Sequence, residues 1–241
     1  MADHEVQLAV PAGIAEAWGL RERPVKGPRP SVSVRTIVEA AVRIADADGV
    51  GAVSMSRVAA EVGVTAMALY RHVGSKDELL ILMVDAALGG PPAMPDEEAP
   101  WRDGLDAWGM GLLAAYQNRP WALRVPITTL PPLPNQVMWM EHGLRCLAAT
   151  RLGEPQKLSS ILLLSNLVRG YALLEQDMSA DATDTFTVVM GQVVGDGRFP
   201  ALARALTEGA LEDESPDSLW PELRFGLDRV LDGISALIER T

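Results

Sequence analysis

The stretch from Ser54 to Leu82, SMSRVAAEVGVTAMALYRHVGSKDELLIL, most constrains the fold, because it predicts two short helices joined by a tight turn. Ser54 is placed to cap the first helix, and Gly63 can take the left-handed conformation that ends it. Thr65 then caps a second helix, predicted over residues 66–73. Helix, glycine-containing turn and helix is the arrangement that sets one helix in a DNA major groove while its partner braces it.

The helices predicted on either side would complete a small core around this unit. Residues 33–47 carry apolar side chains at helical spacing. Ser75 is an N-cap for a helix that runs to about Leu88, with Asp77 and Glu78 in its first turn, where the helix dipole favours anions. A module of about 45 residues is only marginally stable by itself. We therefore expect the helix that Ser75 opens to connect it to the rest of the chain.

Beyond a proline-rich, acidic link at residues 91–100, the pattern is helical throughout. Helices are predicted over residues 101–118, 121–128, 135–151, 154–178, 185–194, 199–210 and 219–240. For residues 185–194 a strand is the alternative, because threonine and valine are frequent there. No strand-rich region and no repeat is evident, so the predicted fold class is all-α, with a three-helix helix-turn-helix domain and a larger helical domain.

Two of these helices, at residues 154–178 and 219–240, have apolar faces wider than packing within one small domain would require. Self-association into a four-helix interface across a two-fold axis would bury them. A dimer would present two helix-turn-helix units to successive grooves. The alternative is that both helices belong entirely to the core of one chain.

Charge is distributed unevenly along the chain. Residues 21–76 hold nine Lys and Arg against five Asp and Glu, 9 − 5 = +4, whereas the whole chain carries −11. A basic end on an acidic body is typical of a localised phosphate-contacting surface. Residues 1–30, rich in proline and glycine, are predicted to be a flexible basic arm that reaches DNA, or else a solvated tail. The predicted domains are therefore 1–30, 31–88 and 95–241.

Composition excludes several other classes of protein. The single cysteine, Cys146, cannot form an internal disulfide and fits a reducing cytoplasm. No apolar run is long enough for a membrane span, and the N-terminus lacks the pattern of a signal peptide. The sequence also lacks a glycine-rich phosphate loop, an HExxH motif and a CxxC motif. We expect a cytoplasmic protein with no membrane association.

The segments VRTIVEAAVRIADADG and VSMSRVAAEVGVTAMALYRHVGSKDELL together resemble the N-terminal domain of TetR-type transcriptional regulators. More weakly, the C-terminal part resembles the ligand-binding domain of the tetracycline repressor. The similar features are Trp101-Arg102-Asp103 after the acidic link and Leu174-Glu175-Gln176-Asp177 at the end of the long helix. The resemblance implies an all-helical homodimer whose larger domain binds ligand and dimerises, and which releases DNA when a small molecule binds.

The resemblance also implies a set of DNA-contacting positions. These are Ser54, Met55 and Ser56 at the start of the bracing helix, Thr65, Ala66, Met67, Ala68, Tyr70, Arg71 and His72 in the recognition helix, and Lys76. Amides and a hydroxyl at the bracing helix would bind phosphate, as would His72 and Lys76. Because residues 66–68 are small or apolar, Arg71 is the best candidate for a bidentate contact to guanine. Tyr70 could instead pack, and His72 could be a surface histidine.

A second set of positions would contact the effector. They are Trp108, Leu112, Trp139, His142, Asn166 and Glu175. Several tryptophans in this half suit an apolar, aromatic ligand, although tryptophans at helical spacing also fit a core. The tetracycline repressor holds a drug with magnesium partly through histidines, and this chain has only His4, His72 and His142. We therefore expect a different effector, with no metal and no cofactor.

The predicted function is that of a homodimeric, ligand-responsive transcriptional regulator, expected to be a repressor, which binds palindromic operator DNA and is released by a small effector. One alternative is a ligand-binding helical protein that uses its N-terminal unit for protein contacts. Another is a thiol enzyme in which His142 and Cys146, four residues apart, pair as base and nucleophile. That single pair on an amphipathic helix is weak support for catalysis, and we expect no enzyme.

Overall fold

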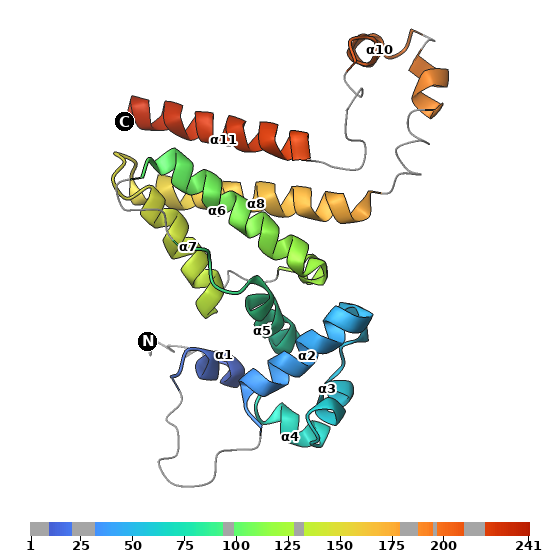
Figure 1. Cartoon of the computed structure of the whole chain (residues 1–241), viewed down its shortest axis with the longest axis vertical. Coiled ribbons are helices and arrows are strands. Elements are labelled where there is room, and N and C mark those ends of the chain that lie inside the picture. Colours follow the sequence, from blue (N-terminus) through green and yellow to red (C-terminus); the bar gives the residue numbers. More distant parts are fainter. Residues whose placement is uncertain are drawn as a thin grey trace, which may run out of the picture.

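The computed structural model describes residues 10–20, 32–93, 99–127, 133–178, 188–194, 197–209 and 220–241. Across these ranges the chain is helical and forms no strand. A small group of helices at one end is joined by α5 (Lys76–Leu88) to a larger bundle (Figure 1). The predicted all-α class is therefore confirmed. No helix in these ranges has the length and hydropathy needed to cross a membrane.

The small group contains α2 (Val34–Asp48), α3 (Met55–Glu61) and α4 (Ala66–Tyr70), with a 3-10 turn, η1 (Val50–Ala52), between α2 and α3. A capping box at Ser33 starts α2, and Gly49, with φ of 80°, ends it. The helices enclose an apolar core that also takes in the first half of α5. Its fully buried members include Ile37, Val58, Leu69, Val73, Leu79 and Met83.

The N-terminal arm departs from its predicted flexibility. Residues Ala12–Ala17 form a helix, α1, that packs against α5 and α2. Glu78 at the start of α5 is buried, and its Oε1 accepts a hydrogen bond of 2.7 Å from the amide of Gly13. Its Oε2 accepts another, also of 2.7 Å, from the amide of Gly74. So short a helix owes its stability to packing, so the sequence pattern gives only weak evidence for it. The predicted basic residues 21–29 lie outside the described residues.

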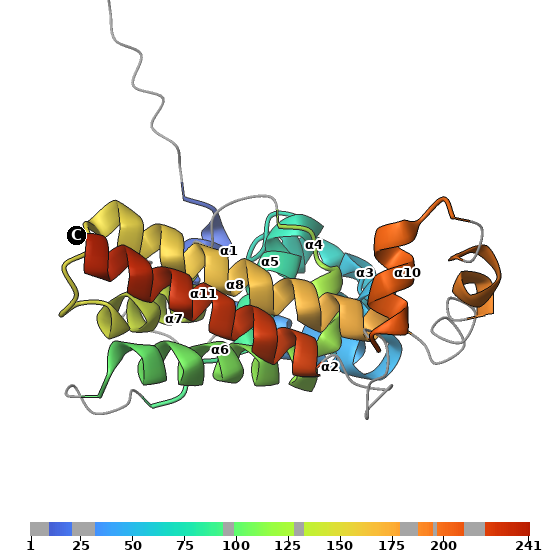
Figure 2. The ribbon, with the colours of Figure 1, turned by 90° about the horizontal axis from the view of Figure 1, so that it is seen from above.

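The larger bundle contains α6 (Trp101–Asn118), α7 (Pro134–Cys146), α8 (Glu154–Asp177) and α11 (Trp220–Arg240), with a 3-10 helix, η2 (Pro120–Arg124). Its core joins side chains from all four helices, among them Leu105, Leu147, Ile161, Leu164, Leu227 and Leu231. Two views show α8 and α11 side by side along the bundle (Figures 1 and 2). In the same views, α10 (Pro200–Thr207) stands apart from it.

Some boundaries differ from prediction for local reasons. The helix predicted to reach residue 151 ends at Cys146, because Leu147 and Ala148 turn back to carbonyls three residues earlier. The helix expected over residues 121–128 is the five-residue 3-10 helix η2. In the segment 185–194, the described residues 188–193 are helical, so the predicted helix is confirmed for that part and the alternative strand is not formed there.

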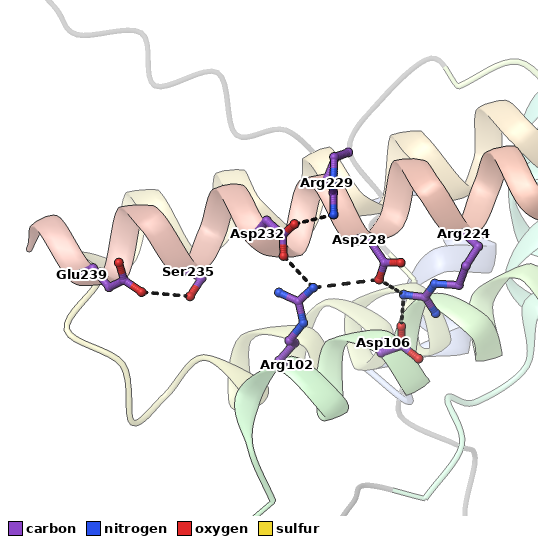
Figure 3. Close-up of polar contacts among 8 residues, drawn as sticks. All are labelled: Arg102, Asp106, Arg224, Asp228, Arg229, Asp232, Ser235 and Glu239. Carbon is purple, nitrogen blue, oxygen red and sulfur yellow. Dashed lines mark hydrogen bonds and ion pairs between the residues drawn. The ribbon is translucent and has the colours of Figure 1, made fainter. Parts of the chain in front are cut away.

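Ion pairs fasten α11 to α6 along one edge of the bundle (Figure 3). Arg224 of α11 lies 2.5 Å from Asp106 of α6, and it also pairs with Asp228 at 2.6 Å. Arg102 of α6 reaches Asp232 at 2.8 Å. These groups are partly exposed, so each pair contributes little free energy on its own, about 0–1 kcal/mol. Arginine and aspartate alternate along both helices, so this charge pattern favours one alignment of α11 on α6.

Candidate functional site

Two short helices and a glycine turn form the first candidate site. Ser54 Oγ accepts a hydrogen bond from the amide of Arg57, which caps α3. Gly63 has φ of 73°, so it supplies the left-handed turn that the sequence predicted. Thr65 Oγ1 then accepts from the amide of Ala68 and caps α4. The predicted helix-turn-helix is therefore present, with its caps on the expected residues.

Replacement of Gly63 by alanine tests this turn. An added Cβ would meet no atom within 4 Å, so the cost is conformational and not steric crowding. Holding alanine at a positive φ costs about 1 kcal/mol. We therefore expect the free energy of unfolding to fall by roughly that amount, measured by urea denaturation. Gly51, which has a negative φ and equally open surroundings, gives a matched control whose replacement by alanine should be tolerated.

Helix α4 and the residues that flank it carry most of the residues predicted to contact DNA. Leu69 is fully buried and anchors the helix, whereas Met67 is 73% exposed and Tyr70 49% exposed. Arg71, the C-cap of α4, is exposed, as are Thr65 and Lys76. Ala66, Ala68 and His72 are partly buried. The exposed members of the predicted set therefore lie on the recognition helix, at its two ends and at the start of α5.

Charge pairing distinguishes Arg71 and Lys76 from other cations of this domain. Arg43 pairs with Glu61 at 3.3 Å, and Arg57 pairs with Asp48. Among the described residues, neither Arg71 nor Lys76 forms an ion pair. Their charges remain available to a phosphate or a guanine edge.

The bracing helix presents a smaller surface than the prediction implies. Met55 is only 6% exposed and packs in the core, so its side chain is unavailable to DNA and its backbone amide alone remains a candidate. Ser56 is exposed, and its hydroxyl lies 3.3 Å from that of Ser54. Helix α4 is also shorter than predicted, because the amides of Arg71 and His72 turn back to carbonyls three residues earlier.

A cavity of about 370 Å³ in the larger bundle is the second candidate site. Its lining comes from α5, α6, η2, α7 and α8 and is mainly apolar. The volume is within the range of small-molecule sites in proteins. The described residues that line it are Ile81, Val84, Leu88, Trp108, Leu112, Tyr116, Ala122, Val125, Pro126, Ile127, Gln136, Trp139, Met140, Ile161, Leu162, Ser165, Asn166 and Arg169.

Two tryptophans form an aromatic wall of this cavity. The rings of Trp108 and Trp139 meet edge to face, with centroids 5.8 Å apart. Trp108 Nε1 donates to the carbonyl of Trp139 at 2.8 Å, and Trp139 Nε1 donates to the carbonyl of Gly89 at 3.0 Å. Because both indole N–H groups are occupied, the rings are fixed and present apolar surface to the cavity.

Four of the six residues predicted to contact a ligand line this cavity, namely Trp108, Leu112, Trp139 and Asn166. Asn166 is exposed, so it lies at an open side and not in the interior. His142 lines a separate space of about 20 Å³ beside Cys146. Glu175 does not line the cavity, and it accepts a hydrogen bond from Gln117 at 3.1 Å.

Polar residues that sequence reasoning missed also line the cavity. Arg169 donates hydrogen bonds to the carbonyls of Leu123 at 3.0 Å and Val125 at 3.3 Å. Burial raises the pKa of the Tyr116 hydroxyl, and the charge of Arg169 partly opposes this shift. Arg169 interrupts the apolar pattern of α8, a signal that could have identified it. Gln136 gave no such signal, because it belongs to the first turn of α7.

A buried carboxylate joins α5 to α7 beside the cavity. Asp85 Oδ1 accepts from the amide of Gln136 at 2.9 Å, and Oδ2 accepts from Asn135 Nδ2 at 3.1 Å. Asn135 Nδ2 also lies 3.1 Å from the Asp85 carbonyl. Burial raises the pKa of the Asp85 carboxyl, while hydrogen bonds from Gln136 and Asn135 oppose the shift. Asp85 thus caps α7 with a side chain from the connecting helix.

A second joint links η2 to α2. Trp121 Nε1 donates to Asp46 Oδ1 at 2.6 Å, and Arg119 lies 3.4 Å from Oδ2 of the same carboxylate. Trp121 is buried in the core of the smaller domain, and its neighbour Ala122 lines the cavity. Two walls of the cavity, α5 and η2, are therefore in direct contact with the helix-turn-helix domain.

The thiol–imidazole pair of the alternative enzyme hypothesis is not formed. Cys146 Sγ donates to the main-chain carbonyl of His142 at 3.3 Å and not to its ring. Burial raises the pKa of the Cys146 thiol, which lowers its thiolate fraction at neutral pH. Within the residues described, no three His, Cys, Asp or Glu side chains gather as they would around a metal ion.

Comparison with known families finds a match for each of the two parts. Residues 37–83 match the family model described as bacterial regulatory proteins, tetR family. Residues 94–238 match that of the tetracyclin repressor-like C-terminal domain. The first range lies within the predicted domain 31–88, and the second begins one residue before the predicted domain 95–241.

Several individual proteins are similar to this chain over most of their own length. The HTH-type transcriptional repressor DrrR1 of Streptomyces coeruleorubidus is 34% identical over 92% of this chain and 84% of its own. The class A tetracycline repressor protein from transposon 1721 of Escherichia coli is 25% identical, over 83% and 89%. Apo ActR of Streptomyces coelicolor superposes with a TM-score of 0.77 at 25% identity, covering 88% of this chain and 99% of ActR. ActR bound to actinorhodin gives a TM-score of 0.75 at 25% identity and the same coverage.

Proposed function

Since the chain belongs to the tetR family of bacterial regulatory proteins, we propose that it is a ligand-responsive transcriptional repressor with α4 as its DNA-reading helix and the 370 Å³ cavity as its effector site. Its operator is proposed to be palindromic, and its place of action the cytoplasm, where bacterial DNA lies. The observation that carries this proposal is that one helix, α5, belongs both to the wall of the cavity and to the core of the DNA-binding domain.

The two roles of α5 fall on different faces of the helix. Leu79 and Met83 are fully buried in the core of the helix-turn-helix domain. Ile81, Val84 and Leu88 line the cavity. A ligand that needs more room on the cavity side must displace α5, and the tightly packed opposite side transmits that displacement to α4. The ligand acts only to the extent that it binds one arrangement better than the other.

A homodimer would convert this displacement into loss of DNA binding. Two recognition helices must meet half-sites about one helical turn apart, so a change in their separation weakens binding steeply. We propose α8 and α11 as the interface, because they lie side by side and carry exposed apolar side chains. Leu163 is 55% exposed and Phe225 66% exposed. Large exposed apolar patches are unusual on monomers.

The effector is proposed to be a largely apolar, aromatic compound. The fixed rings of Trp108 and Trp139 favour a flat apolar surface, and Leu112 extends the same wall. A structure of the relative ActR holds actinorhodin, and another holds (S)-DNPA, which supports a small-molecule effector for this chain as well. We propose that Asn166 contacts the ligand at the open side of the cavity.

The test is binding of the full chain to the DNA upstream of its own gene, measured by fluorescence anisotropy against a scrambled duplex of equal length. We expect saturable binding that prefers the upstream DNA. Between 50 and 200 mM salt the affinity should fall by ~1,000-fold if about six phosphates are contacted. Equal binding to both duplexes would instead favour an N-terminal unit that contacts proteins, and no binding at low salt would contradict the proposal.

A further inference from the structure

The acceptor oxygen of Gln136 is buried without a hydrogen-bond partner. Among the residues that the structure describes, Gln136 Oε1 is the one buried side-chain nitrogen or oxygen left in this state. Buried polar groups in proteins are almost always paired, because an unpaired acceptor loses its bonds to water and gains nothing in return. Gln136 also lines the cavity. The unmet acceptor therefore lies where a ligand can meet it.

The main chain that carries this acceptor is held in place. The Gln136 amide donates to Asp85 Oδ1 at 2.9 Å, and the adjacent Asn135 is tied to the same carboxylate. The backbone of Gln136 thus belongs to a capped helical turn. Because this backbone is ordered before binding, only the side chain of Gln136 loses conformational entropy when a ligand reaches its oxygen.

The indole and guanidinium donors of the lining are bonded elsewhere. The indole N–H groups of Trp108 and Trp139 are both bonded to main-chain carbonyls. Arg169, the only cation in the lining, donates to the carbonyls of Leu123 and Val125. The lining from α5 is purely apolar, through Ile81, Val84 and Leu88. Tyr116, Ser165 and Asn166 also line the cavity, but none of them forms a hydrogen bond with Gln136 Oε1. A ligand can therefore supply the missing donor.

We propose that the effector of this protein is an aromatic compound carrying a hydroxyl or N–H group, which donates a hydrogen bond to Gln136 Oε1. The proposal rests on the cavity being the effector site. An apolar ligand without a donor would cover the oxygen and leave it unpaired, which lowers its affinity. The same site therefore selects against ethers and hydrocarbons of equal shape.

This contact would also act on the joint to α5. Gln136 and Asp85 are linked directly through the amide of Gln136. A ligand that pulls on the Gln136 side chain therefore acts one hydrogen bond away from the connecting helix. A hydrocarbon in the same cavity would press on the walls without engaging this turn of α7.

The experiment compares two tricyclic probes of nearly equal shape, 9-phenanthrol, which has a hydroxyl, and 9-methoxyphenanthrene, which cannot donate. Their binding to the full chain is measured by isothermal titration calorimetry without DNA. We expect 9-phenanthrol to bind about 5- to 10-fold more tightly. In Gln136→Met, which removes the acceptor at similar volume, the preference should disappear. Gln117→Met, on an exposed glutamine outside the cavity, should retain it.

Several results would overturn the proposal. These are equal affinities in the unaltered protein, a preference that survives in Gln136→Met, or no binding of either probe. Gln136→Leu serves as a second variant if Gln136→Met fails to show the cooperative thermal unfolding of a folded protein. Because no DNA is present, loss of the hydroxyl preference contradicts only this inference. Failure of the protein to bind operator DNA contradicts the proposed function instead.

Discussion

Replacement of Arg71 by alanine is expected to lower affinity for the operator by about 5- to 150-fold, equivalent to the ~1–3 kcal/mol carried by a good bidentate contact to a base. Arg71 is exposed at the end of α4 and has no acidic partner among the described residues. Residues 66–68 offer no hydrogen-bonding side chain. We therefore propose that Arg71 carries most of the direct reading of base edges by this helix.

The measurement is anisotropy on the operator and on single-base variants of it. If Arg71 reads a guanine, Arg71→Ala should bind the operator and the duplex altered at that one base pair with equal affinity. Lys76→Ala should instead weaken binding to every duplex by a similar factor and reduce the salt dependence. Arg43→Ala, which removes a cation already paired with Glu61, is the matched control. Equal losses of operator affinity for Arg71→Ala and Arg43→Ala would contradict the assignment of Arg71 to base reading.

Replacement of Asp85 by alanine should destabilise the protein by about 2–3 kcal/mol, because hydrogen bonds to a buried charged group are lost and their donors stay buried. Those donors are the amide of Gln136 and the side chain of Asn135. Chemical denaturation monitored by circular dichroism measures the loss. Asp77→Ala, which removes an exposed carboxylate in the first turn of the same helix, should cost much less. A similar cost for both would show that the joint contributes no special stability.

The pH dependence of stability gives a separate test of Asp85. Its folded pKa is raised by burial, so the folded state holds the proton at a pH where the unfolded state has lost it. The contribution of this group to stability is therefore greatest below the unfolded pKa and falls as the pH rises through the folded one. The difference in unfolding free energy between the unaltered protein and Asp85→Asn should decrease over that window. A difference that rises with pH would contradict the raised pKa.

Local signals in the sequence were enough to place the helix-turn-helix. Ser54 and Thr65 are short polar residues before apolar runs. Gly63 takes a positive φ without the steric cost that a side chain would add. Each of these residues affects only its own backbone and its near neighbours in sequence. The stretch alone therefore determines the helix-turn-helix. Helix α4 proved shorter than its pattern, since the last turn tightens where the chain must reach α5.

The cavity could be predicted only in part, because its polar residues depend on contacts across the fold. Trp108 and Trp139 could be named from spacing and the family resemblance, and both line it. Gln136 differs from any surface glutamine only because Asp85, 51 residues earlier, caps its helix. Likewise, His142 shares a helix with Trp139 but faces a different space. The face of a helix that meets a cavity is set by packing, which periodicity does not report.

The docking of α1 changes what counts as the independent DNA-binding unit. Gly13 lies so close to α5 that an added Cβ would be 2.8 Å from Glu78 Oε1 and 2.9 Å from Leu82 Cδ1. A fragment cut at residue 31, the boundary that the sequence suggests, would uncover Leu82 and remove a donor from the buried Glu78. An excised domain for work with operator DNA should therefore begin before Pro11, so that the first helix travels with the part of the molecule that it stabilises.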